Sequence, residues 1–243
     1  MSMTRIEFPL TGVALLLLSA AGAVAQESGA AQDRFAGQRR DMVRLIADYG
    51  VEDSATLAAM LAVPRHEFVP SEYRSRAYAD RPLPIGYGQT ISQPYIVAYM
   101  TEILKPRPGM KVLEVGTGSG YQAAVLAEIG CEVYTVEIFE ALATSALERH
   151  ERLGYHNVTG RYADGHYGWE EAAPFEAIIV TAAAGYIPPA LVEQLEPGGR
   201  MMIPVGSVYG VQNLILVMKD ADGVVRTRNL LPVRFVPMLK GLR

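Results

Sequence analysis

Three glycines in alternate positions form the strongest chemical signal in this sequence of 243 residues. They follow the apolar run 112–115 and lead into a helical stretch, where glycine lets the backbone approach a ligand closely. The spacing Glu-x-Gly-x-Gly-x-Gly differs from the Gly-x-Gly-x-x-Gly fingerprint of dinucleotide sites, which favours an adenosyl ligand without a pyrophosphate. A tight strand-to-helix connection is the alternative interpretation. The residues expected to bind the ligand here are Glu114, Gly116, Thr117, Gly118, Ser119 and Gly120.

Two acidic residues stand where further strands end. Glu137 closes the run 133–136, at the place where a carboxylate accepts hydrogen bonds from ribose hydroxyls. Asp164 and Gly165 follow the next run, and we expect Asp164 to bind the adenine amine. Thr181, after a fourth run, should also face the ligand. A solvated strand end for Glu137 and an ordinary Asp-Gly turn are the alternatives.

These residues need a sheet that gathers strand ends at one edge. Short apolar runs alternate with helical stretches around Ala123, Leu147 and Val192, which predicts an α/β fold with a doubly wound, mostly parallel sheet, similar to a Rossmann fold. Ligands of such sheets bind at the carboxyl ends of the strands. The expected strands cover residues 111–115, 132–137, 158–162, 177–181, 201–205 and 214–218.

A helical preface precedes the sheet. Met42, Leu45, Ile46 and Tyr49 have the spacing of an amphipathic helix that ends at Gly50. A second helix is expected from about residue 53 to Pro64, with Ser54 as a plausible N-cap. Residues 81–94 are rich in proline and glycine, which predicts an irregular, constrained loop, and residues 95–104 return to a helix. Residues 39–108 thus form the preface and loop, residues 109–243 form the cofactor-binding sheet, and 39–243 make one domain.

Composition excludes several other functions. The net charge of −4 gives no basic field, so nucleic acid is not an expected partner. Cys131 is the only cysteine, so neither an intramolecular disulfide nor a cysteine zinc cluster forms, and a buried structural thiol is expected. The four histidines lack metal-ligand spacing, which predicts no metal site. Trp169 is as consistent with core packing as with the adenine pocket. Arg65, Arg74 and Arg76 could contact a peptide carboxylate, but the default expectation for them is a solvated face.

The N-terminus is typical of an export signal. Arg5 precedes the apolar run 12–21, which is shorter than the span of about 20 residues that crosses a membrane, and Ala23 and Ala25 suit signal peptidase. We expect a signal peptide over 1–25, a linker over 26–38, and a periplasmic or secreted protein with no stable membrane association after cleavage. A cytoplasmic enzyme with a misleading leader is the alternative.

The segment 84–95, Pro-Ile-Gly-Tyr-Gly-Gln-Thr-Ile-Ser-Gln-Pro-Tyr, resembles the signature loop of protein-L-isoaspartate O-methyltransferases. The glycine loop and the two acidic residues resemble those of class I methyltransferases in general. The likeness extends from about residue 39 to residue 241, through Val-Pro-Arg-His-Glu-Phe-Val-Pro at 63–70 and Val-Arg-Phe-Val-Pro at 233–237.

This resemblance implies S-adenosylmethionine as cofactor and isoaspartyl proteins or peptides as substrates. Methylation of the free α-carboxylate would give an ester that closes to a succinimide, whose hydrolysis returns some normal aspartate. Ser92 matches the active-site serine of the family and is expected to orient the carboxylate, with Gln89, Thr90 and Ile91 lining the junction of cofactor and substrate. A monomer is expected. The family mostly acts in the cytosol, so an export signal is a departure from its pattern.

Three rival functions differ in what they need. A class I methyltransferase for another carboxylate or hydroxyl would keep the glycine loop without the segment 89–94. A nicotinamide-dependent oxidoreductase would need a dinucleotide site. A non-catalytic module would bind damaged peptides without transferring a methyl group, and the presence of Ser92, Glu137 and Asp164 argues against it.

Overall fold

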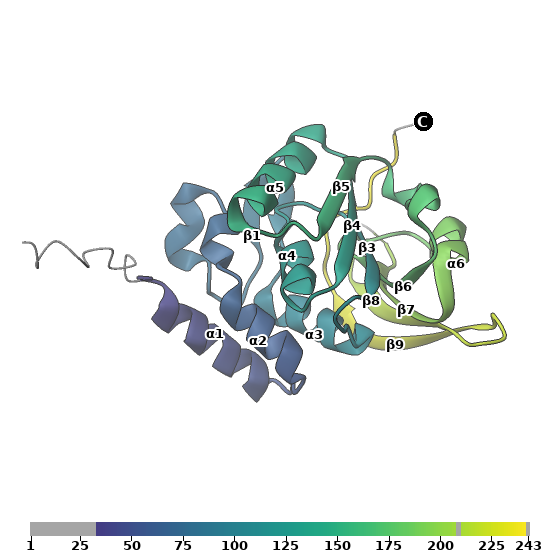
Figure 1. The fold of residues 1–243 in the computed structure, drawn as a ribbon, viewed down its shortest axis with the longest axis horizontal. Coiled ribbons are helices and arrows are strands. Elements are labelled where there is room, and N and C mark those ends of the chain that lie inside the picture. The colour runs from purple at the N-terminus through teal and green to yellow at the C-terminus, as the bar shows by residue number, and fades with distance from the viewer. Residues whose placement is uncertain (1–32, 208–209, 242–243) are drawn as a thin grey trace, which may run out of the picture. The chain divides into compact units, whose positions relative to one another are not determined.

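Apolar runs of the sequence form the centre of a seven-stranded sheet in the computed structural model, which describes residues 33–207 and 210–241 (Figure 1). The strand order is β5-β4-β3-β6-β7-β8-β9. The first five of these are parallel, and β8 and β9 are antiparallel, so the sheet is mostly parallel as predicted. The strands are β3 (Lys111–Val115), β4 (Glu132–Glu137), β5 (Val158–Tyr162), β6 (Phe175–Val180), β7 (Leu195–Val205), β8 (Gln212–Lys219) and β9 (Val225–Val233).

The order of the strands places the ligand site. The chain moves outward from β3 through β4 to β5 and then crosses back to β6 on the other side of β3. From the ends of β3 and β6 the chain therefore continues in opposite directions along the sheet. Open α/β sheets bind ligands in the crevice at such a switch point. The glycine loop leaves β3, and Thr181 follows β6. The glycine loop and Thr181, which the sequence predicts to bind the ligand, therefore lie at the same edge of the sheet.

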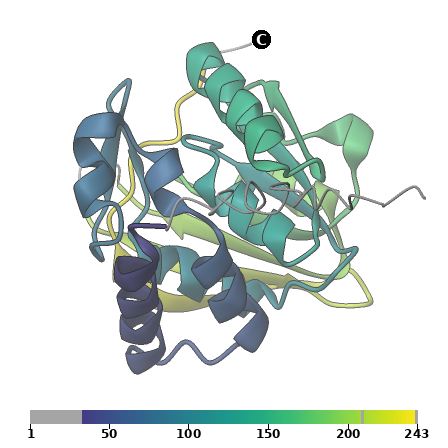
Figure 2. The same ribbon diagram turned by 60° about the vertical axis from the view of Figure 1, so that its left-hand side comes forward.

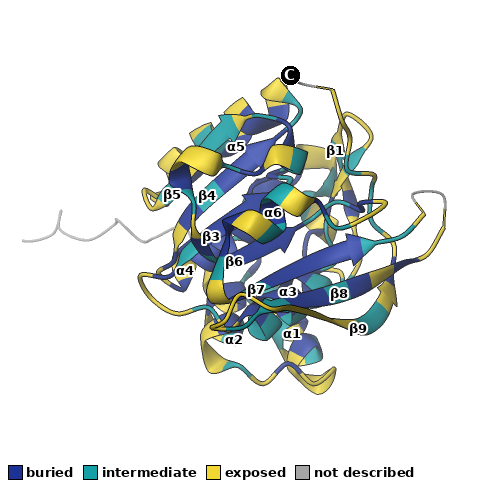
Figure 3. Ribbon diagram, turned by 90° about the vertical axis from the view of Figure 1, so that its right-hand side faces the viewer, coloured by how far each residue is buried: buried dark blue, intermediate teal, exposed yellow. Residues whose placement is uncertain are grey.

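Helices cover both faces of the sheet. α4 (Tyr121–Glu128) and α5 (Glu140–Leu153) lie on one side, and α6 (Pro189–Gln194) lies on the other (Figure 1). Side chains alternate along each strand, so Val112 packs with α4 while its neighbour Leu113 packs with α6. The middle strands are buried, whereas β9 forms a largely exposed edge (Figure 3). Cys131 is buried directly before β4, as expected.

The preface contains the two predicted helices, α1 (Ala36–Asp48) and α2 (Ser54–Ala62), which lie side by side (Figure 2). α1 begins three residues before the expected domain start at residue 39. The N-cap of α2 is Asp53 and not Ser54, because the Asp53 carboxylate accepts a hydrogen bond from Thr56 N at 2.7 Å. Two 3-10 turns follow, η1 (Arg65–Phe68) and η2 (Ser71–Arg76).

The expectation of an irregular loop at 81–94 is wrong. β1 (Leu83–Gly86) pairs with β2 (Gln89–Ile91) in an antiparallel hairpin, and α3 (Pro94–Leu104) follows. Gly86, Tyr87 and Gly88 all have positive φ, so the glycines that predicted a loop form the tip of the hairpin, whose pairing register shifts between Pro84 and Gly86. The hairpin fixes the residues of the signature segment in space.

Other boundaries also differ. β9 has no counterpart among the predicted strands, since its residues are mostly polar and exposed. β7 begins six residues before the predicted strand at 201. Two further 3-10 turns, η3 (Gly165–Tyr167) and η4 (Glu170–Ala172), connect β5 to β6. None of the helices in the described part of the chain has the length and apolar character needed to cross a membrane. The predicted signal peptide and most of the linker lie outside the described residues.

Candidate active site

The glycine loop is held against the loop that follows β6. Gly116, Gly118 and Gly120 all have positive φ, a conformation that side chains rarely adopt. A Cβ atom on Gly116 would lie 2.5 Å from Thr181 Oγ1, so the two loops touch only because this residue has no side chain. Thr181 in turn donates its hydroxyl to the carbonyl groups of Gly116 and Val115. The sequence predicted both loops, and the structure brings them together.

Glu114 presents a buried oxygen without a donor. Its Oε2 accepts a hydrogen bond from Thr135 Oγ1 at 2.5 Å, and the Thr117 hydroxyl lies 2.6 Å from the same Thr135 oxygen. Its Oε1 has no partner among the described residues. Burial raises the pKa of Glu114 to about 8. Glu114 lines a narrow cleft together with Ser92 and the glycine loop, and the amino group of an adenosyl amino acid would supply the missing donor there.

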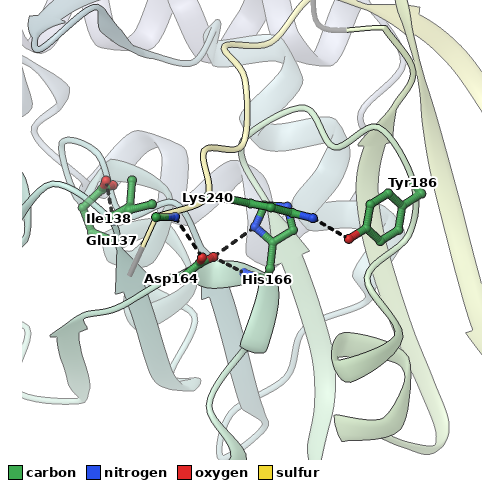
Figure 4. Close-up of polar contacts among 7 residues, drawn as sticks. Glu137, Ile138, Asp164, His166, Tyr186 and Lys240 are labelled. Atoms are coloured by element: carbon green, nitrogen blue, oxygen red, sulfur yellow. Dashed lines mark hydrogen bonds and ion pairs between the residues drawn. The ribbon is translucent and has the colours of Figure 1, made fainter. Parts of the chain in front are cut away.

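Glu137 is buried at the end of β4 and binds backbone amides. Its Oε1 accepts from Ile138 N at 2.9 Å (Figure 4). Oε1 also accepts from Phe139 N at 3.0 Å, and Oε2 accepts from Gly118 N at 2.8 Å. The interpretation as a solvated strand end is therefore wrong. A carboxylate has about four acceptor directions, so acceptor capacity remains after these three bonds. Glu137 lines the cavity described next, where a ribose hydroxyl would use that capacity.

A cavity of about 530 Å³, partly open to solvent, runs from the glycine loop to Gly165 and is called the cofactor cavity here. Apolar side chains from three segments form much of its wall, which suits the faces of an adenine ring. The sequence pattern did not single out its C-terminal wall as part of a cofactor site. The lining residues outside the glycine loop are Gln89, Thr90, Val115, Val136, Glu137, Ile138, Phe139, Gly165, Thr181, Ala182, Val236, Pro237, Met238 and Leu239.

Asp164 turns its carboxylate away from this lining. Oδ1 accepts from His166 N at 2.9 Å and lies 3.0 Å from His166 Nδ1, while Oδ2 accepts from Gly241 N at 3.3 Å (Figure 4). Burial opposes ionisation, but these hydrogen bonds prevail and lower the pKa of Asp164 below its usual value. The carboxylate thus fastens the C-terminal segment over the site, and Gly165 is the residue of this pair that lines the cavity.

A second cavity, the acceptor cavity, lies on the other side of Thr90 and Thr181, which line both spaces. The empty space at this site is about 990 Å³, open solvent at its mouth included. Ser92 lines it, and the Ser92 hydroxyl makes no hydrogen bond to any described residue. The residues predicted to lie at the junction of cofactor and substrate line different spaces. Gln89 lines the cofactor cavity, and the buried Ile91 lines the cleft beside Glu114. The remaining lining residues are Pro82, Gln93, Ile96, Val211, Pro232, Val233, Arg234, Phe235 and Val236.

Arg65 holds the backbone that carries Ser92, so the expectation of a solvated face is wrong for it. It is fully buried, and its Nη2 donates to Ser92 O at 2.6 Å while its Nε donates to Ala77 O at 2.8 Å. Its guanidinium lies 4.7 Å from the centre of the Tyr121 ring. Burial lowers the pKa of Arg65 to about 10, so it stays charged near neutral pH. A buried arginine cannot be told from an exposed one by residue type alone.

The remaining candidates lie apart from the site. Trp169 packs edge-on against Tyr134 and under Arg161 in the core and does not line the cofactor cavity. Arg74 pairs with Glu67, and Arg76 lies over the Tyr73 ring. Within residues 33–207 and 210–241, no group of three or more His, Cys, Asp or Glu side chains has the geometry to hold a metal ion.

Two cavities that meet at Thr90 and Thr181 suit a transfer of a group between a bound donor and a bound acceptor. The unpaired Glu114 oxygen, the Glu137 carboxylate and the apolar end of the cofactor cavity match the amino, ribose and adenine parts of S-adenosylmethionine. The fold and this site define a class I S-adenosylmethionine-dependent methyltransferase.

Comparison with known proteins gives the family. A family model described as Protein-L-isoaspartate(D-aspartate) O-methyltransferase (PCMT) matches residues 37–243. The chain is 55% identical over 239 residues to protein-L-isoaspartate O-methyltransferase 2 of Syntrophobacter fumaroxidans, with 94% of this chain and 95% of the relative covered. It is 54% identical to protein-L-isoaspartate O-methyltransferase 1 of Cupriavidus necator, with 86% and 85% covered. The chain belongs to the protein-L-isoaspartate O-methyltransferase family.

Solved structures agree with this result. One described as a protein-L-isoaspartate O-methyltransferase superposes with a TM-score of 0.78 at 32% identity, covering 84% of this chain and 67% of the other. Another, from Plasmodium falciparum and described as a PCMT in complex with S-adenosyl-L-homocysteine, gives a TM-score of 0.74 at 26% identity and covers 84% of this chain and 99% of the other.

Proposed function

We propose that this enzyme methylates the free α-carboxylate of L-isoaspartyl residues in damaged proteins and peptides. The observation that carries the proposal is the position of Ser92, which lies at the junction of the acceptor cavity and the cleft beside Glu114 with its hydroxyl free of described partners. The resulting ester closes to a succinimide, and hydrolysis of the succinimide returns some normal aspartate. Repeated cycles thereby repair the chain.

The reaction needs positioning more than acid or base catalysis. A carboxylate is ionised at neutral pH because carboxyl groups titrate near pH 4, so the acceptor needs no general base. S-adenosylmethionine supplies an electrophilic methyl group on a sulfonium. Opposite charges merge in the attack, so the enzyme gains chiefly by holding the reactants at contact distance in a site that excludes water.

The site residues divide between these two tasks. Ser92 donates its hydroxyl to the acceptor carboxylate and fixes its direction. Gln89, Thr90 and Ile91 form the partition between donor and acceptor, because they belong to β2 and line the spaces on either side of it. Glu114 accepts from the cofactor amino group and Glu137 from its ribose. The backbone of residues 116–120 and Thr181 make room for the cofactor, with Gly165 at the adenine end.

Transfer of labelled methyl to matched peptides tests the proposal. The protein from Gln26 onward is incubated with labelled S-adenosylmethionine and a peptide that contains either isoaspartate or normal aspartate at one position. We expect base-labile methyl ester on the isoaspartyl peptide only. Equal labelling of both peptides, or cofactor binding with no transfer to either, would contradict the proposal and favour another acceptor or a non-catalytic relative.

We further propose that the enzyme is exported and acts as a monomer in the periplasm or outside the cell. The support for export is the charged start, the apolar run 12–21 and the small residues at 23 and 25. An exported enzyme needs a supply of cofactor outside the cytosol. Size-exclusion chromatography with light scattering on the processed protein tests the monomer, and a dimer mass would overturn it.

A further inference from the structure

The acceptor cavity contains one charged side chain. Of its twelve lining residues only Arg234 is ionisable, and the others are apolar or carry hydroxyl or amide groups. Among the described residues the Arg234 guanidinium has no hydrogen bond, ion pair or ring contact, and its side chain is exposed to solvent. A cation at the mouth of a neutral cavity is available to an anionic group of whatever enters that cavity.

The backbone that carries Arg234 is fixed on both sides. Val233 pairs with Gln212 at the end of the β8–β9 ladder and is buried. Phe235 N donates to Gln212 Oε1 at 3.0 Å, and Val236 O accepts from Ala183 N at 2.8 Å. Side chains alternate along an extended chain, so Arg234 points away from the core when Val233 points into it. The backbone position from which the Arg234 side chain extends is therefore fixed at the cavity wall.

Arg234 is poorly suited to bind the carboxylate that is methylated. That carboxylate loses its negative charge as the ester forms, so a cation bound to it would stabilise the ground state more than the transition state and slow the reaction. A carboxylate that keeps its charge throughout suffers no such loss. The useful partner of Arg234 is thus a second carboxylate of the same peptide.

We propose that Arg234 is a specificity residue that binds the carboxylate of an acidic residue flanking the isoaspartyl residue. This inference rests on the proposed function and adds a preference for acidic peptides. A guanidinium forms two parallel hydrogen bonds to a carboxylate, which gives direction as well as affinity. A charge pair of this kind acts mainly on substrate binding, so the preference for an acidic flanking residue should appear in kcat/KM. It should weaken at high salt, because salt screens the pair.

Matched isoaspartyl peptides test the proposal. They differ only at one of the two positions on either side of isoaspartate, where the residue is Glu, Gln or Lys. kcat/KM is measured at low and high salt for the wild type, Arg234→Gln and Arg234→Lys. Arg228→Gln is the control, because Arg228 is exposed on β9, has no described ion pair and lies outside the cavity lining, so the variant loses the same net charge nearby.

We expect the wild type to prefer Glu over Gln by about fivefold to tenfold in at least one position, with Lys lowest. Arg234→Gln should abolish the ratio, Arg234→Lys should keep part of it, and Arg228→Gln should retain it. Equal rates for all peptides in the wild type, or an equal loss for all of them in Arg234→Gln, would overturn the inference while leaving the proposed function intact. Failure of every peptide to be methylated by the wild type would overturn both.

Discussion

At the scale of single residues, Glu114 links cofactor binding to protonation. Its pKa is raised by burial to about 8, whereas an unfolded carboxyl titrates near 4.3. Between these values the folded protein keeps a proton that the unfolded chain has released. Stability from this site is therefore complete below about pH 4 and declines as the pH rises toward 8.

The substitution Glu114→Gln should remove this decline, since glutamine stays neutral. We expect the free energy of unfolding of the wild type to fall relative to the variant by on the order of 3 kcal/mol between pH 5 and pH 8, measured by urea denaturation at several pH values. The variant should also bind S-adenosylhomocysteine about tenfold more weakly by calorimetry, because the positive amino group of the ligand favours the ionised form of Glu114, whereas glutamine cannot become a charged acceptor. Parallel pH profiles of the two proteins would refute the buried, protonated state of Glu114.

Ser92→Ala tests the orienting hydroxyl. The hydroxyl fixes the direction of the acceptor carboxylate, and misplacement of a reacting group costs up to about 100-fold in rate, so we expect kcat to fall roughly 10- to 100-fold. Affinity for S-adenosylhomocysteine should stay within about twofold, because no described hydrogen bond joins the hydroxyl to the cofactor cavity. Ser71→Ala, on the exposed η2 turn, is the matched control. A normal rate in Ser92→Ala would remove the role assigned to Ser92.

The residues that line the site can be predicted from the sequence more readily than the hydrogen bonds that they form. Glu114, Glu137 and Thr181 were expected to bind the cofactor, and they line the cofactor cavity or the cleft beside it, because each lies at or near the carboxyl end of a strand of the parallel sheet. Asp164 was expected there too, but its carboxylate binds His166 and the amide of Gly241, which lies 77 residues away in the chain. A contact that depends on where the C-terminal segment returns has no local signature.

At the scale of elements, the β1–β2 hairpin depends on the 3-10 turn that carries Arg65. The Arg65 guanidinium bonds the carbonyls of Ala77 and Ser92, and its Nη1 is buried without a described partner. Loss of the side chain would leave two carbonyls without donors and a cavity beside Tyr121. The buried arginine therefore acts as a positioning residue for the loop between β2 and α3.

Arg65→Met and Arg65→Lys should separate stability from positioning. We expect Arg65→Met to lower the free energy of unfolding by about 3 kcal/mol, since it leaves two carbonyls that Arg65 now bonds without donors. Arg65→Lys keeps the charge, but its single ammonium group cannot bond both carbonyls as the planar guanidinium does. We therefore expect this variant to lose less stability than Arg65→Met. Its kcat should still fall about tenfold, with unchanged binding of S-adenosylhomocysteine. Arg74→Lys, on the exposed η2 turn, is the control.

In Arg65→Lys, a kcat that falls only in proportion to the unfolded fraction would show that the residue is merely structural. Circular dichroism at the assay temperature gives that fraction. Recovery of most of the rate in Arg65→Lys compared with Arg65→Met would instead show that charge alone, without the fork geometry, holds the Ser92 backbone.

Elements with a regular apolar pattern were predicted closely, and those without one were not. β3 and β4 have the expected bounds, because these middle strands are mostly buried and their sequences are largely apolar. β5 also has the expected bounds, although its residues are half-buried or exposed. The hairpin was missed because its glycines and prolines indicate a loop, although Gly86 and Gly88 permit its tight tip. β9 was missed because an exposed edge strand needs few apolar residues.

At the scale of the whole molecule, the C-terminal segment joins the two halves of the site. Residues 232–236 line the acceptor cavity, and residues 236–239 line the cofactor cavity. Gly241 N is bonded to Asp164, and Lys240 donates to Tyr186 OH at 2.8 Å (Figure 4). One short stretch therefore lines both cavities, and its contacts lie far apart in the sequence.

Processing of the N-terminus is the prediction that concerns the chain as a whole. Cleavage after Ala25 would leave the described fold intact, since the first helix begins at Ala36, and would leave the net charge at −4 because Arg5 and Glu7 cancel. We expect expression of the full sequence in a Gram-negative host to yield periplasmic protein that starts at Gln26, as shown by intact mass and N-terminal sequencing. Substitution of Ala23 and Ala25 by bulky residues should block cleavage, because signal peptidase requires small side chains there. Recovery of the enzyme in the cytosol with residues 1–25 still attached would overturn export and return the enzyme to the compartment in which its cofactor is made.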